Sequence, residues 1–234
     1  MTRTRIAVLA SGGGTNLQAL LDHFEQRGER RQGDVVLVAS DRASAGALER
    51  ARVRGITAAL LPTPRRVEGL ELAPLLEQHG VELIALAGYL RHVPDSVVRR
   101  YAGRIVNVHP ALLPAFGGAG MYGARVHEAV LAAGVTVSGA TVHFVEEEYD
   151  RGPIIAQWPV PVLSGDDAAT LAARVLRVEH LLYPRIVDAL AGGRVSLAAC
   201  RDGRRLIATP DAQFIMYSRK DDCLVEAIDR ALEC

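Results

Sequence analysis

Asn107 and His109 stand two residues apart at the end of a short apolar run that begins at Ile105. Alternate residues of a strand point to the same face, so the amide and the imidazole would lie side by side. Two hydrogen-bond donors aimed at one point stabilise the negative charge that develops on a carbonyl oxygen under nucleophilic attack. The pair therefore predicts an oxyanion site, although a histidine followed by proline is also typical of a structural turn.

Asp150 supplies a carboxylate further along the chain, within Tyr149-Asp150-Arg151-Gly152-Pro153. This composition is typical of a turn, which is the simpler interpretation. The alternative is that Asp150 approaches His109, where a carboxylate would fix the tautomer of the imidazole and favour its protonated form; the residues alone do not show that contact. Thr141 and His143 share one face of the preceding strand, and each is either a satisfied polar residue or part of the same network.

Three consecutive glycines, Gly12, Gly13 and Gly14, lie between an apolar run and a helical pattern and are followed by Thr15 and Asn16. A loop without Cβ atoms at the start of a helix exposes backbone N–H groups and binds anions, above all phosphate. Leu17 stands where a dinucleotide-binding loop has its third glycine, and no Gly-Lys-Ser/Thr follows. The loop therefore predicts a site for a single terminal phosphate, although one glycine would be enough for a tight turn.

Short apolar runs alternate with helical patterns in the first half of the chain. The runs are 5–10, 35–40, 58–61, 83–87 and 105–108, and the helical patterns are 16–29, 43–54 and 67–79. Strands that are apolar throughout are covered on both faces, which is typical of a parallel sheet with right-handed crossovers. The sequence predicts an α/β fold with a doubly wound, Rossmann-like, mostly parallel sheet.

The pattern changes after Pro110. A glycine-rich loop at 117–123 precedes a helix at 124–133, two long strands at 138–147 and 154–160 that run antiparallel, and a helical region at 166–191. We expect Pro184 near a kink or break in that helix and Gly192-Gly193 at its end. The predicted domain covers 1–205 and has two halves, 1–108 and 109–205; no role is assigned to 206–234.

The composition of the 234 residues argues against some classes of binding partner. Lys plus Arg and Asp plus Glu both number 27, so no long-range positive field favours nucleic acid or an anionic membrane. Cys200, Cys223 and Cys234 show no Cys-x-x-Cys spacing, which suits a reducing compartment and predicts no metal site. The apolar run at 6–10 is too short for a signal peptide or a membrane span, so we expect a cytoplasmic protein.

Several segments occur in the order found in one enzyme family. They are Ala-Ser-Gly-Gly-Gly-Thr-Asn-Leu at 10–17, Leu-Ala-Gly-Tyr-Leu-Arg at 86–91, Asn-Val-His-Pro-Ala-Leu-Leu-Pro at 107–114, Gly-Ala-Thr-Val-His-Phe-Val at 139–145, Asp-Arg-Gly-Pro-Ile-Ile at 150–155 and Glu-His at 179–180. Over residues 4 to 205 the chain resembles the phosphoribosylglycinamide formyltransferases, folate-dependent enzymes of purine synthesis.

The resemblance implies transfer of a formyl group from 10-formyltetrahydrofolate, a co-substrate, to the amine of glycinamide ribonucleotide, with no metal. Asn107 and His109 would hold the oxyanion, and Asp150 would orient His109 and organise the water that carries the amine's proton. The enzyme would be a monomer or a homodimer.

The resemblance also implies that 1–108 is a ribonucleotide-binding half and 109–205 a folate-binding, catalytic half, with two binding sites. The ribonucleotide site would contain Gly12, Gly13, Gly14, Thr15, Asn16 and Glu179. The folate site would contain Arg65 (or Arg66 in a shifted register), Tyr89, Leu90, Arg91, His92, Val93, Asn107, Val145, Glu146 and Asp150. Four features depart from the family. Ala115 replaces a longer polar residue, for which Arg125 is a candidate substitute. His92 replaces an aliphatic residue, the loop at 117–122 is longer than in the shortest relatives, and the tail beyond 204 has no counterpart.

Four other functions compete with this one. Methionyl-tRNA formyltransferase would add a basic C-terminal domain, and formyltetrahydrofolate hydrolase would add a domain ahead of the first strand; we expect neither domain here. A nicotinamide-dependent oxidoreductase would use the glycine loop, with Asp41 binding a ribose hydroxyl, but would leave Asn107, His109 and Asp150 without a role. A non-catalytic nucleotide-binding module would explain the glycine loop alone.

Overall fold

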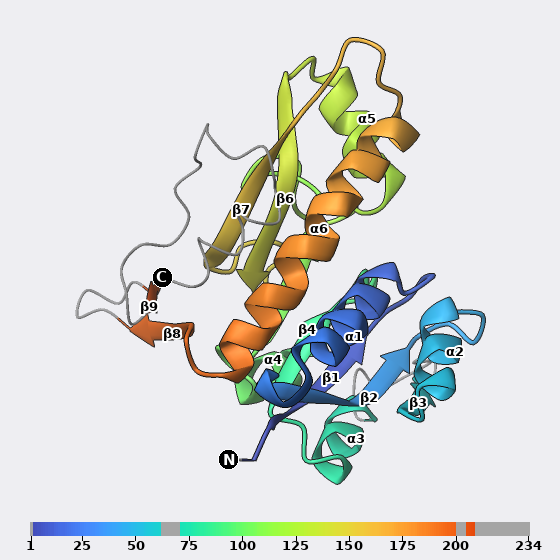
Figure 1. Ribbon diagram of the computed structural model, residues 1–234. Coiled ribbons are helices and arrows are strands. Elements are labelled where there is room, and N and C mark those ends of the chain that lie inside the picture. The colour runs from blue at the N-terminus through green and yellow to red at the C-terminus, as the bar shows by residue number, and fades with distance from the viewer. Residues whose placement is uncertain (1, 62–70, 200–204, 209–234) are drawn as a thin grey trace.

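A mixed sheet lies at the centre of the computed structural model, which describes residues 2–61, 71–199 and 205–208 (Figure 1). Within those residues its strand order is β3-β2-β1-β4-β5-β6-β7. The strands are β1 (Thr4–Leu9), β2 (Gly33–Ser40), β3 (Thr57–Leu60), β4 (Leu83–Leu86), β5 (Ile105–His109), β6 (Val137–Phe144) and β7 (Ile154–Pro161). Neighbours pair in parallel up to β5, and β6 pairs antiparallel with both β5 and β7. The predicted fold class, including one antiparallel strand, is confirmed.

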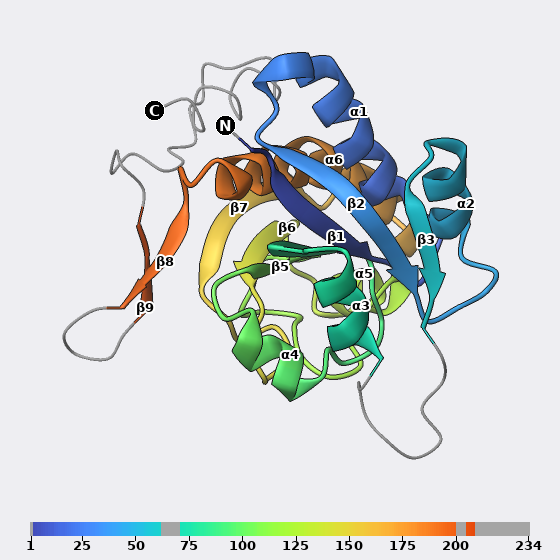
Figure 2. The ribbon, with the colours of Figure 1, turned by 90° about the horizontal axis from the view of Figure 1, so that it is seen from below.

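Helices cover both faces of this sheet, as the view in Figure 2 shows for α1 and α6 on one side and α3 and α4 on the other. The helices are α1 (Thr15–Arg27), the 3₁₀ turn η1 (Gly28–Arg30), α2 (Gly46–Val53), α3 (Leu72–Gln78), α4 (Asp95–Arg100), α5 (Ala124–Ala132) and α6 (Ala168–Ala191). Alternate residues of β1 pack against the helices on the two opposite faces of the sheet. Ile6 and Val8 pack in the core beneath α1, α2 and α6, whereas Ala7 and Leu9 pack in the core beneath α3 and α4.

The α6 helix continues through Pro184, so of the kink or break expected near that residue, the break is wrong. Pro184 is buried together with Tyr183, Ile186 and Val187. Proline removes one backbone hydrogen bond, a cost of about 3 kcal/mol, and the apolar burial of several neighbouring side chains outweighs it. The helix ends at Gly192, as the Gly192-Gly193 pair predicted.

Three elements were not predicted. The α4 helix follows Pro94, its N-cap residue, and β8 (Ser196–Ala199) and β9 (Arg205–Ala208) pair antiparallel in a separate two-stranded sheet. The helical pattern near the C-terminus, at 222–232, lies outside the described residues, as does Arg65.

The chain reverses its direction of travel across the sheet between β1 and β4. From β1 it proceeds outward to β2 and β3, and it then returns to place β4 on the other side of β1. In open α/β sheets, ligands bind at the carboxyl ends of the strands beside such a switch point. The loops that follow β1 and β4 therefore mark the expected site.

Candidate active site

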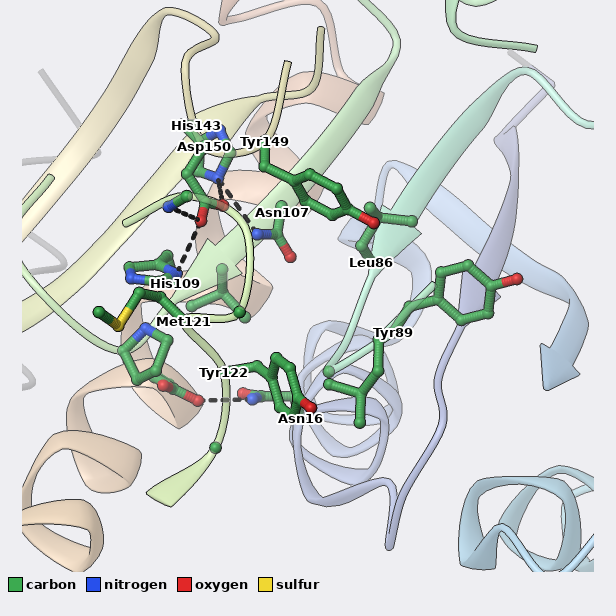
Figure 3. Close-up of a pocket in the computed structure, with 18 of the residues that line it drawn as sticks. Asn16, Leu86, Tyr89, Asn107, His109, Met121, Tyr122, His143, Tyr149 and Asp150 are labelled. Atoms are coloured by element: carbon green, nitrogen blue, oxygen red, sulfur yellow. Dashed lines mark hydrogen bonds and ion pairs between the residues drawn. The ribbon is translucent and has the colours of Figure 1, made fainter. Parts of the chain in front are cut away.

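A cavity of about 880 Å³ lies at the carboxyl ends of the central strands. Asn16, from the start of α1, lines it together with the loop after β4, the end of β5, the loop at 118–124 and residues of α6. Its volume lies in the upper part of the range typical of small-molecule sites. Asn107, His109 and Asp150 all line this cavity, although they come from distant parts of the chain (Figure 3).

The two ring nitrogens of His109 face different partners. Nε2 lies 2.8 Å from the carbonyl oxygen of Phe116, which can only accept, so Nε2 carries a proton. Nδ1 lies 3.6 Å from Oδ2 of Asp150. Burial lowers the pKa of His109, and the negative charge of Asp150 opposes this without reversing it. Asp150 does favour the protonated ring, as expected. The effect of burial on the pKa is larger, so the resting ring is neutral.

Asp150 is held as a carboxylate in a constrained turn between β6 and β7. Its φ of 55° lies in the left-handed region, and its Oδ2 accepts a hydrogen bond from the Gly118 N–H at 2.9 Å. Burial alone would raise the pKa of Asp150, but the contact between Oδ1 and His143 at 3.5 Å, the nearby His109 and the hydrogen bond from the Gly118 N–H together outweigh burial and lower it. Gly152 allows the close turn, because a Cβ there would overlap the Phe144 carbonyl.

His143 contacts both Asn107 and Asp150, whereas the sequence left its role open. Its Nδ1 donates to the Phe144 carbonyl at 2.8 Å, so Nδ1 carries a proton and Nε2 can accept. The Nδ2 group of Asn107 donates to this nitrogen at 3.1 Å. The contact fixes the orientation of the Asn107 amide and leaves its second N–H for another acceptor. Thr141 instead supports the backbone, accepting from Leu113 N–H and donating to the Ala111 carbonyl.

The glycine loop after β1 directs its carbonyl groups into the protein. The Gly12 carbonyl accepts from Ala47 N–H, the Gly13 carbonyl from Arg50 Nε, and the Gly14 carbonyl from Gln18 N–H. Within the described chain, no acceptor takes the N–H groups of these three glycines. Free amides beside the N-terminus of α1 are suited to binding an anion, and the phosphate site at this loop stays a prediction.

Asn16 and Glu179 connect this loop to α6. Both side chains are buried, and Asn16 Nδ2 donates to Oε2 of Glu179 at 2.6 Å. Burial raises the pKa of Glu179 to about 7, while the hydrogen bond from Asn16 works in the opposite direction. Near neutral pH the Glu179 carboxyl group can therefore either accept a hydrogen bond or, when protonated, donate one. Both residues line the cavity, whereas residues 12–15, which were assigned to the same ribonucleotide site, are not part of its lining.

The expected folate residues lie on two loops that meet across the cavity. Of that set, Tyr89, Leu90, Arg91, His92, Val93, Val145 and Glu146 all line it. Nε2 of His92 donates to the Glu147 carbonyl at 2.8 Å, and its ring packs edge-on against Tyr149. His92 thus joins the loop after β4 to the loop that carries Asp150.

The cavity is also lined by residues that the sequence analysis did not name individually, among them Met121, Tyr122 and His127. The only signal for the first two was the glycine-rich loop around them, and His127 had none. Arg125, the suggested substitute at the phosphate, is exposed and packs over the Tyr122 ring at 5.1 Å.

Within residues 2–61, 71–199 and 205–208, no group of three or more His, Cys, Asp or Glu side chains could hold a metal ion. No helix in the same part of the chain is both long enough and apolar enough to span a membrane.

Comparison with known proteins places this site in context. A family model described as formyl transferase matches residues 4–187. A phosphoribosylglycinamide formyltransferase of Escherichia coli (strain K12) is 38% identical over 208 residues, which cover 86% of this chain and 95% of the relative. Chloroplastic enzymes of the same name from Vigna unguiculata and Arabidopsis thaliana are 42% and 44% identical, and the chain spans 62% and 67% of their lengths.

Solved structures show the same fold. Glycinamide ribonucleotide transformylase 1 from Symbiobacterium toebii superposes with a TM-score of 0.77 at 42% identity, over 88% of this chain and 94% of that one. A formyltetrahydrofolate deformylase from Pseudomonas syringae gives a TM-score of 0.76 at 26% identity, over 88% of this chain and 66% of that one.

Proposed function

The chain belongs to the formyl transferase family, and we propose that it transfers a formyl group from 10-formyltetrahydrofolate to the amine of glycinamide ribonucleotide, a step of purine synthesis. The names of the E. coli, plant and S. toebii relatives support this substrate pair. The E. coli relative carries particular weight, because the chain covers almost its whole length.

One observation carries the proposal: Asn107, His109 and Asp150 converge on one cavity that also receives Asn16 and Glu179 from one side and the loop 89–93 from the other. An anion cradle lies next to Asn16, so a phosphorylated amine can be anchored beside the oxyanion donors. Holding two substrates together removes an entropic barrier on the order of 7 kcal/mol in favourable systems. The site thus has the parts that a two-substrate acyl transfer requires.

The reaction forms a bond between the ribonucleotide's amine nitrogen and the formyl carbon, and it breaks the bond between that carbon and the folate nitrogen. Negative charge develops on the formyl oxygen meanwhile. The second N–H of the Asn107 amide donates to this oxygen. His109 can donate from Nδ1 only as the imidazolium, because Nε2–H is engaged by Phe116.

The protons balance through the His109–Asp150 pair. The attacking amine loses a proton, which the neutral His109 takes directly or through water, and the ionised Asp150 stabilises the resulting imidazolium. The imidazolium then stabilises the oxyanion and returns the proton to the leaving folate nitrogen. The pair therefore ends the cycle in its starting state.

One observation counts against the oxidoreductase function, and another favours the hydrolase function. For an oxidoreductase, Asp41 would have to bind a ribose, but its carboxylate accepts a hydrogen bond from the Ser11 hydroxyl at 2.5 Å. A hydrolase that releases formate from the same folate is favoured by the similarity to the P. syringae deformylase. The phosphate cradle and the Asn16–Glu179 pair are left without a role in a hydrolase.

A monomeric or homodimeric enzyme, without nucleic-acid or membrane partners, stays a prediction. So does the cytoplasmic location, since the plant relatives are named as chloroplastic. The division into halves at 108 also stays a prediction, with both halves contributing to the one cavity.

A direct assay tests the proposed function. Pure protein is mixed with 10-formyltetrahydrofolate and glycinamide ribonucleotide, and the absorbance of the deformylated folate is followed. We expect its release to depend on the ribonucleotide and to match formylated ribonucleotide mole for mole. Equal release without the ribonucleotide would indicate the hydrolase instead, and no release in either mixture would overturn both functions.

A further inference from the structure

Ser11 joins the two loops that flank the switch point of the sheet. Its backbone N–H donates to the Gly88 carbonyl at 3.0 Å, and its Oγ accepts from the Leu90 N–H at 2.9 Å. The side chain is 2% exposed and does not line the cavity. The loop after β1 and the loop after β4 are thus connected through one residue.

Asp41 completes the connection from the end of β2. The Ser11 hydroxyl donates to Oδ1 of Asp41 at 2.5 Å, so one oxygen both accepts from Leu90 and donates to a carboxylate. The Asp41 side chain is about nine-tenths buried. Hydrogen bonds to an ionised acceptor are short and strong, and consecutive bonds polarise one another. The Leu90–Ser11–Asp41 chain is therefore a stiff link.

The ends of this link coincide with the anchors of two different substrates under the proposed function. Ser11 directly precedes the anion cradle that begins at Gly12, and Gly88 and Leu90 flank Tyr89 in the folate wall. In a bimolecular transfer the reacting atoms must come within about 3–3.5 Å, and an error of about 1 Å costs roughly 100-fold in rate. A link between the two anchors sets that separation.

We propose that Ser11 and Asp41 are positioning residues that hold the ribonucleotide site and the folate site in register. The inference rests on the proposed function and adds two residues that touch neither substrate. Its consequence is specific: loss of the link lowers kcat, because each substrate still finds its own loop but the two loops no longer hold the reacting atoms at the right distance.

Ser40 offers a matched control. It is fully buried and lies next to Asp41 in the sequence, but its Oγ accepts from the Arg42 N–H within its own loop. Ser40→Ala therefore removes the same hydroxyl from an equally buried place without touching the link. A merely structural role for Ser11 would make the two serine variants alike.

The test compares Ser11→Ala, Asp41→Ala, Asp41→Asn and Ser40→Ala with the wild type. For each protein, kcat, the KM of both substrates, Tm and the calorimetric affinity for ribonucleotide alone are measured. Ser11→Ala and Asp41→Ala should lose at least tenfold in kcat, with KM values and ribonucleotide affinity within threefold of wild type. Asp41→Asn should recover most of the loss, because its amide oxygen still accepts from Ser11, and Ser40→Ala should keep wild-type kcat.

A wild-type kcat in Ser11→Ala, or an equal loss in Ser40→Ala, would overturn the inference. If Ser11→Ala does not fold, the two Asp41 variants decide: equal kcat in both would contradict the link. An inactive wild type would overturn the proposed function and this inference with it, whereas an active wild type with unaffected variants would overturn the inference alone.

Discussion

Nδ1 of His109 lies 3.6 Å from Oδ2 of Asp150, in a site where the other ring nitrogen is already bound to the Phe116 carbonyl. This relationship determines how the ring can act. A neutral ring with its proton on Nε2 presents a lone pair at Nδ1, so it begins the cycle as a base. The ring becomes a hydrogen-bond donor at Nδ1 only after it takes a proton from the amine. At that stage the formyl oxygen carries negative charge and needs a hydrogen-bond donor.

The first prediction concerns the titration of His109. Its pKa should lie below 6.5, because burial outweighs the charge of Asp150. In Asp150→Asn the pKa should fall further, since the larger of the two contributions that raise it is removed and only the Phe116 hydrogen bond remains. NMR titration of ¹⁵N-labelled protein measures both values, with His109→Gln to assign the resonance. A higher pKa in Asp150→Asn than in wild type would contradict this account.

Asn107 should contribute to the rate and little to substrate affinity. Removing one donor from an oxyanion site typically lowers kcat by about 100-fold to 1,000-fold. We expect that loss in Asn107→Ala, with the KM of the ribonucleotide within threefold of wild type. Steady-state kinetics provide the measurement. A kcat within threefold of wild type would remove Asn107 from the proposed oxyanion site.

Gly13 and Gly14 should respond to substitution in opposite ways. A Cβ on Gly13 would meet no protein atom within 4 Å, whereas a Cβ on Gly14, at φ 74°, would come within 2.7 Å of Ala47 Cα. Gly13→Val should keep a Tm near that of wild type and raise the KM of the ribonucleotide at least tenfold, by blocking backbone approach to the phosphate.

Gly14→Ala should instead lower the free energy of unfolding by about 1–2 kcal/mol or more, from the left-handed backbone alone. Denaturant unfolding and steady-state kinetics on both variants separate the two effects. An unchanged ribonucleotide KM in Gly13→Val would count against the cradle.

Glu179 should make stability depend on pH in an unusual direction. Its pKa rises from 4.5 to about 7 on folding, so the folded state favours the protonated form. The associated stability is fully present below pH 4.5 and is lost as the pH rises to about 7, a change of about 3 kcal/mol. Glu179→Gln, which cannot ionise, should gain about that much relative to wild type between pH 4.5 and 8. Denaturant unfolding across this range measures the difference, and a gap independent of pH would refute the prediction.

Much of the fold followed from local pattern. The apolar residues Leu17, Leu20, Leu21 and Phe24 recur at helical spacing, and all four are buried on α1. The runs without alternation became parallel strands covered on both faces. Pro184 misled the prediction because a local rule describes one lost hydrogen bond, whereas the outcome depended on packing along the whole of α6.

Less of the candidate site than of the fold could be predicted from the sequence. Alternation could place Asn107 beside His109 on β5, but only the resemblance linked Asp150 to them across 41 residues. His143 could not be assigned, because its role depends on which atoms face it across the β5–β6 pair. The neutral state of His109 was also missed, since burial is a property of the folded cavity and not of neighbouring residues in the chain.

Turnover and ribonucleotide affinity, measured side by side for His109→Ala and Asp150→Ala, test the three-residue centre most directly. The account predicts that formyl transfer falls at least about 1,000-fold in each variant, as expected when an acid–base group and its charge partner are lost. Calorimetry should find the ribonucleotide bound within threefold of wild-type affinity, since its anchors are Asn16, Glu179 and the glycine loop. Wild-type turnover in either variant would contradict the assignment.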